Sequence, residues 1–382
     1  MKVAHLVSTF PPYRGGIGNA AYHISWELAQ LGHSVTVFTP RRLFGDYSLD
    51  QSLPFKVKRL IPFARYGNAA FVPQLLWAAG NFDIVHLHYP FFGGAEMLYL
   101  RDIARPLTIV LHYHMDVVGE GIMKRFFEIH SKQVLPRILD HAASIIVTSM
   151  DYAQQSRIRD MLSVHSAKCV TVPLGVNPDV FKPRMKNREL LDRHGLHHKK
   201  VILFVGSLDR AHYFKGVNYL IKAFQLIASN DNYRLIVVGG GSLKKSYESI
   251  TINFGLDRKI IFTGEVPNDA LPLYYNLADV FVLPSIDSSE AFGMAILEAM
   301  SSGIAVVASD LPGVRSVVQK DVTGQLVKPR AINALAKYLH FLLENPQVTN
   351  RLGVEGRARV MREYTWESVG KAVQDVYQRL KP

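Results

Sequence analysis

The stretch VFVLPSIDSSEAFGMAILEAM at residues 280–300 joins a predicted strand to a predicted helix. Its first six residues form a short apolar run, and its last seven are rich in Ala, Met, Leu and Glu, which favour a helix. Gly293 falls in the first turn, where the missing side chain lets a ligand approach the backbone closely. The unpaired amides and the positive end of the helix dipole predict an anion site suited to a diphosphate.

Two carboxylates flank that predicted site. Glu290 and Glu298 are eight residues apart, which corresponds to ~12 Å of helix rise. This is roughly the separation of a sugar and a ribose across a diphosphate, so we expect one carboxylate to accept sugar hydroxyls and the other ribose hydroxyls. The alternative is a capped helix with two solvated glutamates. It explains each residue alone, but not the succession of strand, SSEAFG turn and helix.

The sequence on either side of this stretch alternates strands and helices. Such alternation predicts a parallel sheet covered on both faces. In the first half of the chain, a helix at residues 19–31 accompanies five short apolar strands, at 3–8, 34–39, 84–88, 108–112 and 145–148.

The same pattern restarts after residues 173–183, which contain three prolines and a glycine and read as a linker. Expected strands follow at 201–206, 234–238, 259–263, 280–284 and 305–309, with a helix at 217–229 and an amphipathic helix near the end. We therefore expect an α/β protein with two Rossmann-like, doubly wound domains and an interdomain cleft that binds ligand. The expected domains are residues 1–178 and 179–365, with the helix at 366–382 packing back on the first domain.

Composition narrows the function classes. The 382 residues carry a net charge of +12, but residues 1–185 hold 19 Lys/Arg against 13 Asp/Glu, and the remainder holds 25 against 19. The charge is thus spread evenly, without the basic tail or block typical of nucleic-acid proteins, and we expect no nucleic-acid partner. A basic surface also suits phosphorylated ligands and anionic membranes.

The single cysteine and the hydropathy pattern indicate a protein of the cytosol. Cys169 excludes an internal disulfide framework, and its Val/Thr-rich surroundings predict a buried, inert thiol. No apolar run approaches the ~20 residues of a spanning helix, and charge and His interrupt the N-terminal segment MKVAHLVSTF. We expect a cytoplasmic location, with the inner face of the membrane as the site of any peripheral binding.

Residues 41–65 contain the densest mixture of basic and apolar side chains. One interpretation is a solvated loop face. The other is docking to an anionic membrane surface. The residues concerned are Arg41, Arg42, Lys56, Lys58, Arg59 and Arg65, among Phe55, Leu60, Ile61 and Phe63.

The segment GIGNAA at residues 16–21 matches the dinucleotide fingerprint G-x-G-x-x-A. The two arginines at 41–42, after the second expected strand, would even suggest NADP as the dinucleotide. The fingerprint should begin directly at a strand end, however, and residues 9–15 with two prolines intervene here. An oxidoreductase is therefore disfavoured.

Four histidines occupy the ends of two expected strands. His86 and His88 share one face of their strand, as do His112 and His114 on the next. Such a group could bind zinc, although histidines buried in a core and satisfied by hydrogen bonds are commoner.

The chain resembles the retaining glycosyltransferases of family 4, which have the GT-B fold. The resemblance spans nearly the whole sequence and rests on the E-x7-E motif at 290–298, together with PPYRGGIGNA (11–20), HYHMD (112–116), PLGVNPDVFKP (173–183), FVGSLDRAHYFKG (204–216) and SDLPG (309–313). The linker, FKG and E-x7-E elements together are specific to that family.

The resemblance implies roles for residues of the second domain. Glu290 corresponds to the glutamate that contacts the donor sugar, and Glu298 to the one that binds the ribose. Phe292, Gly293 and Met294 supply amides near the diphosphate, and Lys215 corresponds to the lysine that stabilises the departing nucleotide. The family usually has an arginine where this chain has Ser207, and the nearby Arg210 is the candidate to replace it.

The resemblance also implies roles in the first domain. His114 corresponds to the histidine that approaches the donor sugar, with Asp116 supporting it. Gly15 and Gly16 belong to a loop near the diphosphate and the acceptor. The D-x-D triplet of metal-dependent transferases is missing from the sequence, so we expect neither a metal nor another cofactor.

The expected function is a retaining hexosyltransferase that uses a nucleotide sugar. By analogy we favour GDP-mannose over UDP-glucose or UDP-N-acetylglucosamine, with a lipid-linked glycan or polysaccharide precursor as the acceptor. Base selection is expected from backbone atoms at 264–266 and from the loop after 239–241. A sugar-nucleotide epimerase of the same fold and a non-catalytic sugar-nucleotide-binding protein are the alternatives.

Overall fold

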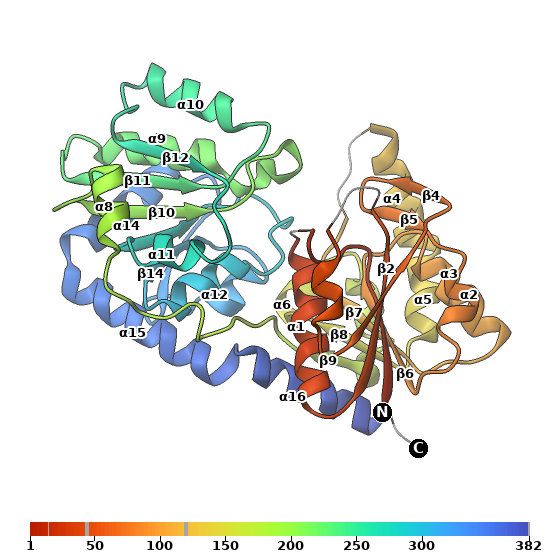
Figure 1. Cartoon of the computed structure of the whole chain (residues 1–382). Coiled ribbons are helices and arrows are strands. Elements are labelled where there is room, and N and C mark those ends of the chain that lie inside the picture. The colour runs from red at the N-terminus through yellow and green to blue at the C-terminus, as the bar shows by residue number, and fades with distance from the viewer. Residues whose placement is uncertain (14, 43–45, 118–120, 381–382) are drawn as a thin grey trace. The chain divides into compact units, whose positions relative to one another are not determined.

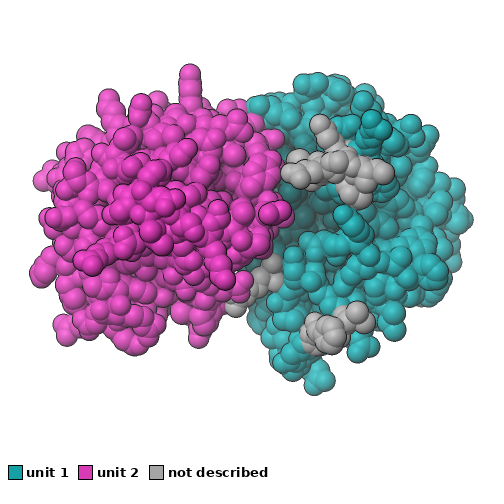
Figure 2. All heavy atoms as spheres, turned by 90° about the horizontal axis from the view of Figure 1, so that it is seen from above, with its two compact units in different colours: residues 1–175, 366–382 teal, residues 176–365 magenta. Residues whose placement is uncertain are grey.

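The computed structural model describes residues 1–13, 15–42, 46–117 and 121–380, so the last two residues of the expected C-terminal helix lie outside the described part. The chain forms two compact units, coloured separately in Figure 2. The N-terminal unit comprises Met1–Gly175 and Trp366–Pro382, and the C-terminal unit comprises Val176–Thr365. The change from one unit to the other, at Gly175, lies within the expected linker at 173–183.

The N-terminal unit is built on a parallel sheet with strand order β3-β2-β1-β6-β7-β8-β9. Apart from the exposed Lys2 at the start of the first strand, its central strands are buried along their length, in keeping with their largely apolar sequences. The strands are β1 (Lys2–Leu6), β2 (Ser34–Pro40), β3 (Lys56–Leu60), β6 (Ile84–Tyr89), β7 (Ile109–Tyr113), β8 (Ser144–Val147) and β9 (Cys169–Thr171), and a small antiparallel hairpin adds β4 (Ala64–Tyr66) and β5 (Ala69–Phe71).

Helices connect these strands. They are α1 (Gly16–Gln30), α2 (Leu75–Ala78), α3 (Ala95–Ala104), α4 (Gly121–Gln133), α5 (Leu135–His141), α6 (Met150–Ala153) and α7 (Arg159–Leu162), with 3-10 turns at Ser48–Gln51 and Ser166–Lys168.

The C-terminal helix α16 (Trp366–Arg379) returns to this unit and packs against α1, as the blue and red helices in Figure 1 show. The Trp366 and His23 rings stack with centroids 4.7 Å apart. At Gly370 an added Cβ would lie 2.4 Å from the Cβ of Glu27, so this glycine permits the close approach of the two helices.

The C-terminal unit contains a second parallel sheet, with strand order β12-β11-β10-β13-β14-β15. Its strands are β10 (Lys200–Val205), β11 (Tyr233–Val238), β12 (Ile260–Gly264), β13 (Val280–Leu283), β14 (Ala305–Ser309) and β15 (Gly324–Val327). Its helices are α8 (Arg188–His194), α9 (Val217–Ile227), α10 (Lys244–Asn253), α11 (Leu271–Tyr275), α12 (Met294–Ser301), α13 (Val314–Val317), α14 (Ile332–Glu344) and α15 (Pro346–Glu363), with a 3-10 segment at Arg210–Lys215.

The structure confirms the expected fold class: two doubly wound α/β sheets. The expectation for Cys169 was wrong in part. The residue does lie in a strand, β9, but that strand is at the sheet edge, and its thiol is only half-buried. Among the described residues, no helix is both long enough and apolar enough to cross a membrane.

Candidate functional site

Lys215 and Glu290 form an ion pair at the carboxyl ends of β10 and β13, with 2.6 Å between Lys215 Nζ and Glu290 Oε2. Backbone contacts hold the two loops together. The amide of Ile286 donates to the carbonyl of Phe214 at 2.8 Å. A Cβ at Gly216, where φ is +71°, would lie 2.1 Å from the carbonyl oxygen of Pro284, so only glycine fits there.

The pair is well shielded from water. Only 17% of the Lys215 side chain and 8% of the Glu290 side chain are exposed. Ser285 adds a hydrogen bond, because its hydroxyl donates to Glu290 Oε2 at 3.0 Å. Each of the two buried charges is therefore compensated by the other.

Gly293 precedes α12 in a left-handed conformation, with φ of +88°. The helix begins at Met294, so Glu290 lies in the turn before it, and the ~12 Å helical spacing expected for the two glutamates was wrong. The Ile296 amide donates to the carbonyl of Gly293 at 2.8 Å, and the amides that precede it at the start of α12 remain the predicted anion site. Phe292 packs its buried ring 6.3 Å from that of Tyr364.

Glu298 occupies the first turns of α12 and bonds to a tyrosine that the sequence analysis missed. The Tyr275 hydroxyl donates to Glu298 Oε2 at 2.6 Å. Burial raises the pKa of Glu298 to about 7, although the bond from Tyr275 and the charge of Lys215 both act to lower it. The carboxyl group is thus partly protonated near neutral pH. The positive charge of Lys215, which pairs with Glu290, acts on the pKa of Glu298 as well.

Arg210 begins the 3-10 segment and is exposed. Its backbone amide donates to Ser242 Oγ at 3.3 Å. Ser207, which stands in place of the family arginine, donates its hydroxyl to Asp209 Oδ2 at 3.1 Å. Within the described residues, no contact joins the Arg210 guanidinium to Lys215 or Glu290, so its assignment stays a prediction.

Glycines bring the loop after β11 against the loop after β10. Gly239 has φ of +143°, and a Cβ there would lie 1.9 Å from the carbonyl oxygen of Gly206. Gly241 has φ of +144°, with a Cβ position 2.3 Å from the carbonyl carbon of Leu208. Both need glycine, which places backbone rather than side chains along this edge of the sheet.

In the N-terminal unit, Gly18 has the closest packing in the glycine-rich segment. A Cβ there would lie 2.7 Å from the carbonyl oxygen of Thr9. At Gly15, which precedes α1, it would lie 3.0 Å from the Tyr13 ring, and at Gly16 it would meet nothing within 4 Å. The chain itself therefore does not require a glycine at Gly16, and close approach of a ligand there stays a prediction.

His114 and Asp116 follow β7 but do not bond to each other. The Asp116 carboxylate accepts the hydroxyl of Tyr113 and, at 3.1 Å, the backbone amide of Arg157. His114 Nε2 instead lies 2.9 Å from His88 Nδ1, and His114 Nδ1 is buried without a partner. His88 is thus the hydrogen-bond partner of His114 in this structure, and the supporting role expected for Asp116 stays a prediction.

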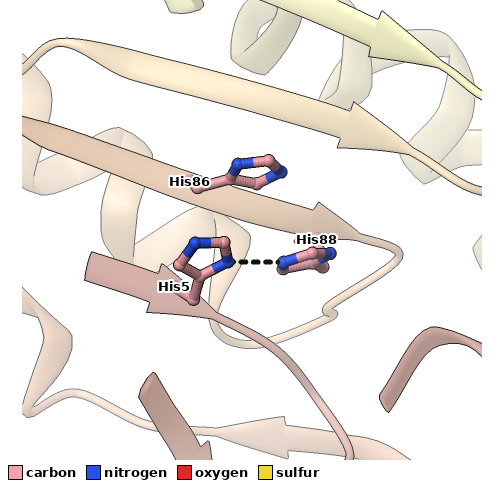
Figure 3. A group of neighbouring side chains, drawn as sticks. All are labelled: His5, His86 and His88. Atoms are coloured by element: carbon pink, nitrogen blue, oxygen red, sulfur yellow. Dashed lines mark hydrogen bonds between the residues drawn. The ribbon is translucent and has the colours of Figure 1, made fainter. Parts of the chain in front are cut away.

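Five buried histidines, His5, His86, His88, His112 and His114, share one face of β1, β6 and β7. In Figure 3, His5 and His88 are joined by a hydrogen bond of 2.9 Å, and His86 stacks on both rings with interplanar angles of 17°. Ligand nitrogens do lie within 4.8 Å of one another in two groups of three. However, lone pairs in stacked rings run side by side and do not converge on one point, which favours hydrogen bonding over tetrahedral zinc.

The basic and apolar segment at 41–65 divides into two parts. Phe55 is buried, and the Arg59 side chain is only 9% exposed and pairs with Asp50 at 2.7 Å, so neither is available for docking. Three large side chains beside the β4–β5 hairpin are exposed: Ile61 at 66%, Phe63 at 82% and Tyr66 at 67%. We call these three residues, with the exposed Arg41, Lys56, Lys58 and Arg65, the hairpin patch.

Two families match the chain. The family described as Glycosyltransferase Family 4 matches residues 14–180, and the family described as Glycosyl transferases group 1 matches residues 187–359. The first match falls in the N-terminal unit except for its last five residues, and the second lies within the C-terminal unit.

Curated relatives align along nearly their whole length. An uncharacterized glycosyltransferase of Methanocaldococcus jannaschii is 25% identical over 99% of this chain and 98% of its own. An O-antigen chain mannosyltransferase C of Escherichia coli is 26% identical over 100% and 99%. A phosphatidyl-myo-inositol mannosyltransferase of Mycobacterium leprae is 28% identical over 95% and 93%.

Solved structures share the fold. Sucrose-phosphate synthase from Thermosynechococcus elongatus matches with a TM-score of 0.79 and 23% identity over 100% of this chain and 99% of its own. Anabaena HepE in complex with UDP and glucose matches with a TM-score of 0.80 and 18% identity, over 99% of each chain. The chain therefore belongs to glycosyltransferase family 4, and it is a hexosyltransferase with the GT-B fold.

Proposed function

We propose that the enzyme transfers a hexose, with retention of configuration, from a nucleotide sugar to a hydroxyl of a lipid-linked glycan or polysaccharide precursor. The observation that supports this most is the shielded Lys215–Glu290 pair beside the first turn of α12. A cation, a carboxylate and the backbone amides at the start of a helix together match the diphosphate and the hydroxyl groups of such a donor.

Each charged group has a part in binding the donor. Lys215 and the α12 amides bind the diphosphate, and Glu290 accepts hydrogen bonds from hydroxyls of the hexose. Glu298 accepts the ribose hydroxyls and gives up its proton when they bind. When the diphosphate arrives, Lys215 exchanges its contact with Glu290 for one with phosphate oxygens, which frees the carboxylate for the sugar.

The proposed reaction exchanges one bond at the anomeric carbon for another. The bond to the diphosphate oxygen breaks with its electron pair staying on the diphosphate, and the acceptor oxygen forms its bond from the same face. The acceptor's proton passes to that diphosphate oxygen. Lys215 and the helix N-terminus stabilise the accumulating negative charge, so the reaction as proposed uses no metal.

The relatives favour mannose as the hexose. The relatives from E. coli and M. leprae are both named as mannosyltransferases, and others similar to this chain are named as GDP-mannose-dependent. Their names also include lipid or polysaccharide acceptors, which supports the acceptor class proposed here. The HepE complexes contain UDP or UDP-glucose, so UDP donors belong in any test.

A thermal-shift panel of nucleotides and nucleotide sugars tests the donor. A ligand present at 100 times its Kd should stabilise the protein by ~2.7 kcal/mol. We expect GDP and GDP-mannose to give the largest shifts, and product analysis with the chosen donor and a lipid-linked acceptor to show a new glycosidic bond. Conversion of donor without acceptor would indicate an epimerase, and donor binding without any turnover would indicate a binding protein.

Metal-independence has its own test. Activity should survive EDTA, because Lys215 and α12 supply the positive charge that a metal would otherwise provide. If chelation abolishes turnover and one specific metal restores it, the proposal is wrong on this point, and the buried histidines become the first candidates for ligands.

A further inference from the structure

The five histidines form two hydrogen-bonded rows across the sheet. In the first row, His5 Nδ1 lies 2.9 Å from His88 Nε2, and His88 Nδ1 lies 2.9 Å from His114 Nε2. These bonds run diagonally, because the strand register places His5 opposite His86 and His88 opposite His112. The first row thus reaches from β1 across β6 to the end of β7.

The second row lies against the first. His86 Nε2 is 3.2 Å from His112 Nδ1, and His86 Nδ1 is 2.5 Å from the Tyr377 hydroxyl. His112 stacks on His114 with ring centroids 4.1 Å apart. The two rows are therefore alike in burial and stacking, although the second contains Tyr377 in place of a third histidine, and only the first has a hydrogen bond to His114.

All five imidazoles are neutral at working pH. Burial lowers the pKa of His5 and of His114 to about 3, and it lowers those of the other three well below the usual 6.5. A neutral imidazole has one N–H and one acceptor nitrogen. Every hydrogen bond along the first row must consequently point the same way, so the tautomer of His5 and that of His114 are coupled.

The ends of the first row decide its direction. His5 Nε2 and His114 Nδ1 are both buried and without partners in the described part of the chain. One of them carries the terminal N–H, and the other is a bare acceptor. Buried donors without an acceptor are rarer in proteins than buried acceptors with an unused lone pair. The terminal N–H is therefore favoured at His114, which is 4% exposed, whereas His5 is fully buried, so a ligand acceptor can meet only the His114 end.

We propose that His88 and His5 are positioning residues that hold His114 as its Nδ1–H tautomer, so that Nδ1 donates a hydrogen bond to a hydroxyl oxygen of the transferred sugar. The proposal rests on the proposed function and on the role that the resemblance to family 4 implies for His114, as the histidine that approaches the donor sugar. It adds a direction to that role: His5 donates to His88, and His88 donates to His114.

Solution NMR of the unmodified protein tests the direction without any substitution. With ¹⁵N-labelled histidine, the ring nitrogens of His5, His88 and His114 should each report protonated Nδ1 and bare Nε2. An Nε2–H tautomer at His114, or a mixture of both tautomers, would overturn the proposal.

Substitution tests the coupling. His88→Phe should lower kcat by ~10–100-fold, a range typical when a group that orients a functional histidine is lost, while the Kd for nucleoside diphosphate stays within about twofold. His5→Phe removes a ring whose hydrogen bond goes to His88 and not to His114, and it should also lower kcat. His88→Asn, which keeps a side-chain N–H for His114, should retain more activity than His88→Phe.

The second row provides the matched control. The double variant His86→Phe/Tyr377→Phe removes one buried imidazole together with its hydroxyl partner, and its kcat should stay within about threefold of the unmodified enzyme. Equal losses of kcat in the two rows would show a structural role only. His114→Phe separates the two proposals: if it remains active, the role of His114 itself fails, whereas an inactive His114→Phe beside fully active His88→Phe and His5→Phe rejects only the row.

Discussion

The two units neutralise their buried polar groups in different ways. In the C-terminal unit, charges compensate each other: Lys215 pairs with Glu290, and Glu298 is bonded to Tyr275 with a raised pKa. In the N-terminal unit, five buried imidazoles with lowered pKa values are joined by hydrogen bonds, although His5 Nε2 and His114 Nδ1 have no partner among the described residues. The comparison is thus between one site whose opposite charges compensate each other and one site whose neutral rings share directional hydrogen bonds.

Because of this difference, we expect substitutions in the two sites to affect binding, stability and turnover differently. A charged pair must open before it can bind a ligand, so its substitution alters affinity, protonation and stability together. A neutral row changes little when a ligand binds, and its substitution should appear mainly in turnover.

The largest effect is expected for Glu290→Gln. The carboxylate contacts the hexose in our proposal, and loss of one charged contact that develops in the transition state costs ~10²–10³ in kcat. The Kd for free nucleoside diphosphate should change much less, because that ligand has no hexose. Turnover assays and calorimetry on the same preparation measure both quantities.

Stability must be followed in that variant, since the substitution also leaves Lys215 without its partner. Thermal denaturation should show a folded protein. If nucleotide affinity falls as far as turnover, Glu290 does not face the sugar.

The next effect concerns pH and Glu298. Its folded pKa of about 7 lies above the usual 4.5, so the native state binds more protons than the unfolded state between these values. The unfolding free energy should therefore fall as pH rises from 5 to 8, by up to about 3 kcal/mol at 1.36 kcal/mol per pKa unit. Glu298→Gln, which is neutral at every pH, should flatten this part of the profile.

Glu344→Gln is the control for that profile. Its carboxylate has a lowered pKa, mainly because it accepts hydrogen bonds from Tyr233 and Lys200, so its contribution changes below pH 5. Denaturation at pH 5, 6, 7 and 8 compares the three proteins. Parallel curves for the unmodified protein and Glu298→Gln would show that Glu298 is ionised throughout.

A smaller effect is expected for Lys215→Ala. Loss of a charged hydrogen bond to the diphosphate is worth ~1.5–3 kcal/mol, or about 10–100-fold in the nucleoside diphosphate Kd. The exposed Lys222 on α9 supplies the matched control, and Lys222→Ala should leave the Kd unchanged. Calorimetry that finds the same diphosphate Kd in Lys215→Ala and in the unmodified protein would refute the phosphate assignment.

Sequence patterns were sufficient for the fold, and they selected Lys215 and Glu290, which the structure joins in an ion pair, whereas the donor-binding roles of these residues stay predictions. Alternating strands and helices gave both sheets, and the E-x7-E motif pointed to Glu290 and Glu298. The exact geometry did not follow, because Gly293 delays the helix until Met294 and so removes Glu290 from it. The helical spacing assumed for the two carboxylates was therefore wrong.

Contacts between distant segments were harder to foresee. Tyr275 reaches Glu298 from another helix, and no spacing rule connects the two. His5 was missed because its only link to His88 is the lateral register of β1 and β6. Period-two spacing did place His86 with His88, and His112 with His114, on a common face. Which ring bonds to which depends on diagonal neighbours that a single sequence does not specify.

The smallest effect is expected at the membrane, where the hairpin patch of the N-terminal unit combines exposed Phe63 with basic side chains. We propose that this patch binds anionic lipid headgroups. Binding to anionic vesicles should weaken as salt rises, because charges at a surface are screened beyond ~10 Å at 0.1 M. Phe63→Ser should reduce vesicle binding by about fivefold, since a side chain that inserts only partly recovers part of the ~1.5–3 kcal/mol of full burial.

Met185 provides a control of equal exposure outside the patch, because it is 88% exposed in the C-terminal unit. Met185→Ser should bind vesicles as the unmodified enzyme does, and neither substitution should change the nucleoside diphosphate Kd. Equal binding to neutral and anionic vesicles would contradict the electrostatic part of the proposal, and equal losses in the two variants would contradict the placement of the patch. An effect confined to Phe63 would assign lipid contact to the N-terminal unit and leave nucleotide binding with the charged groups of the C-terminal unit.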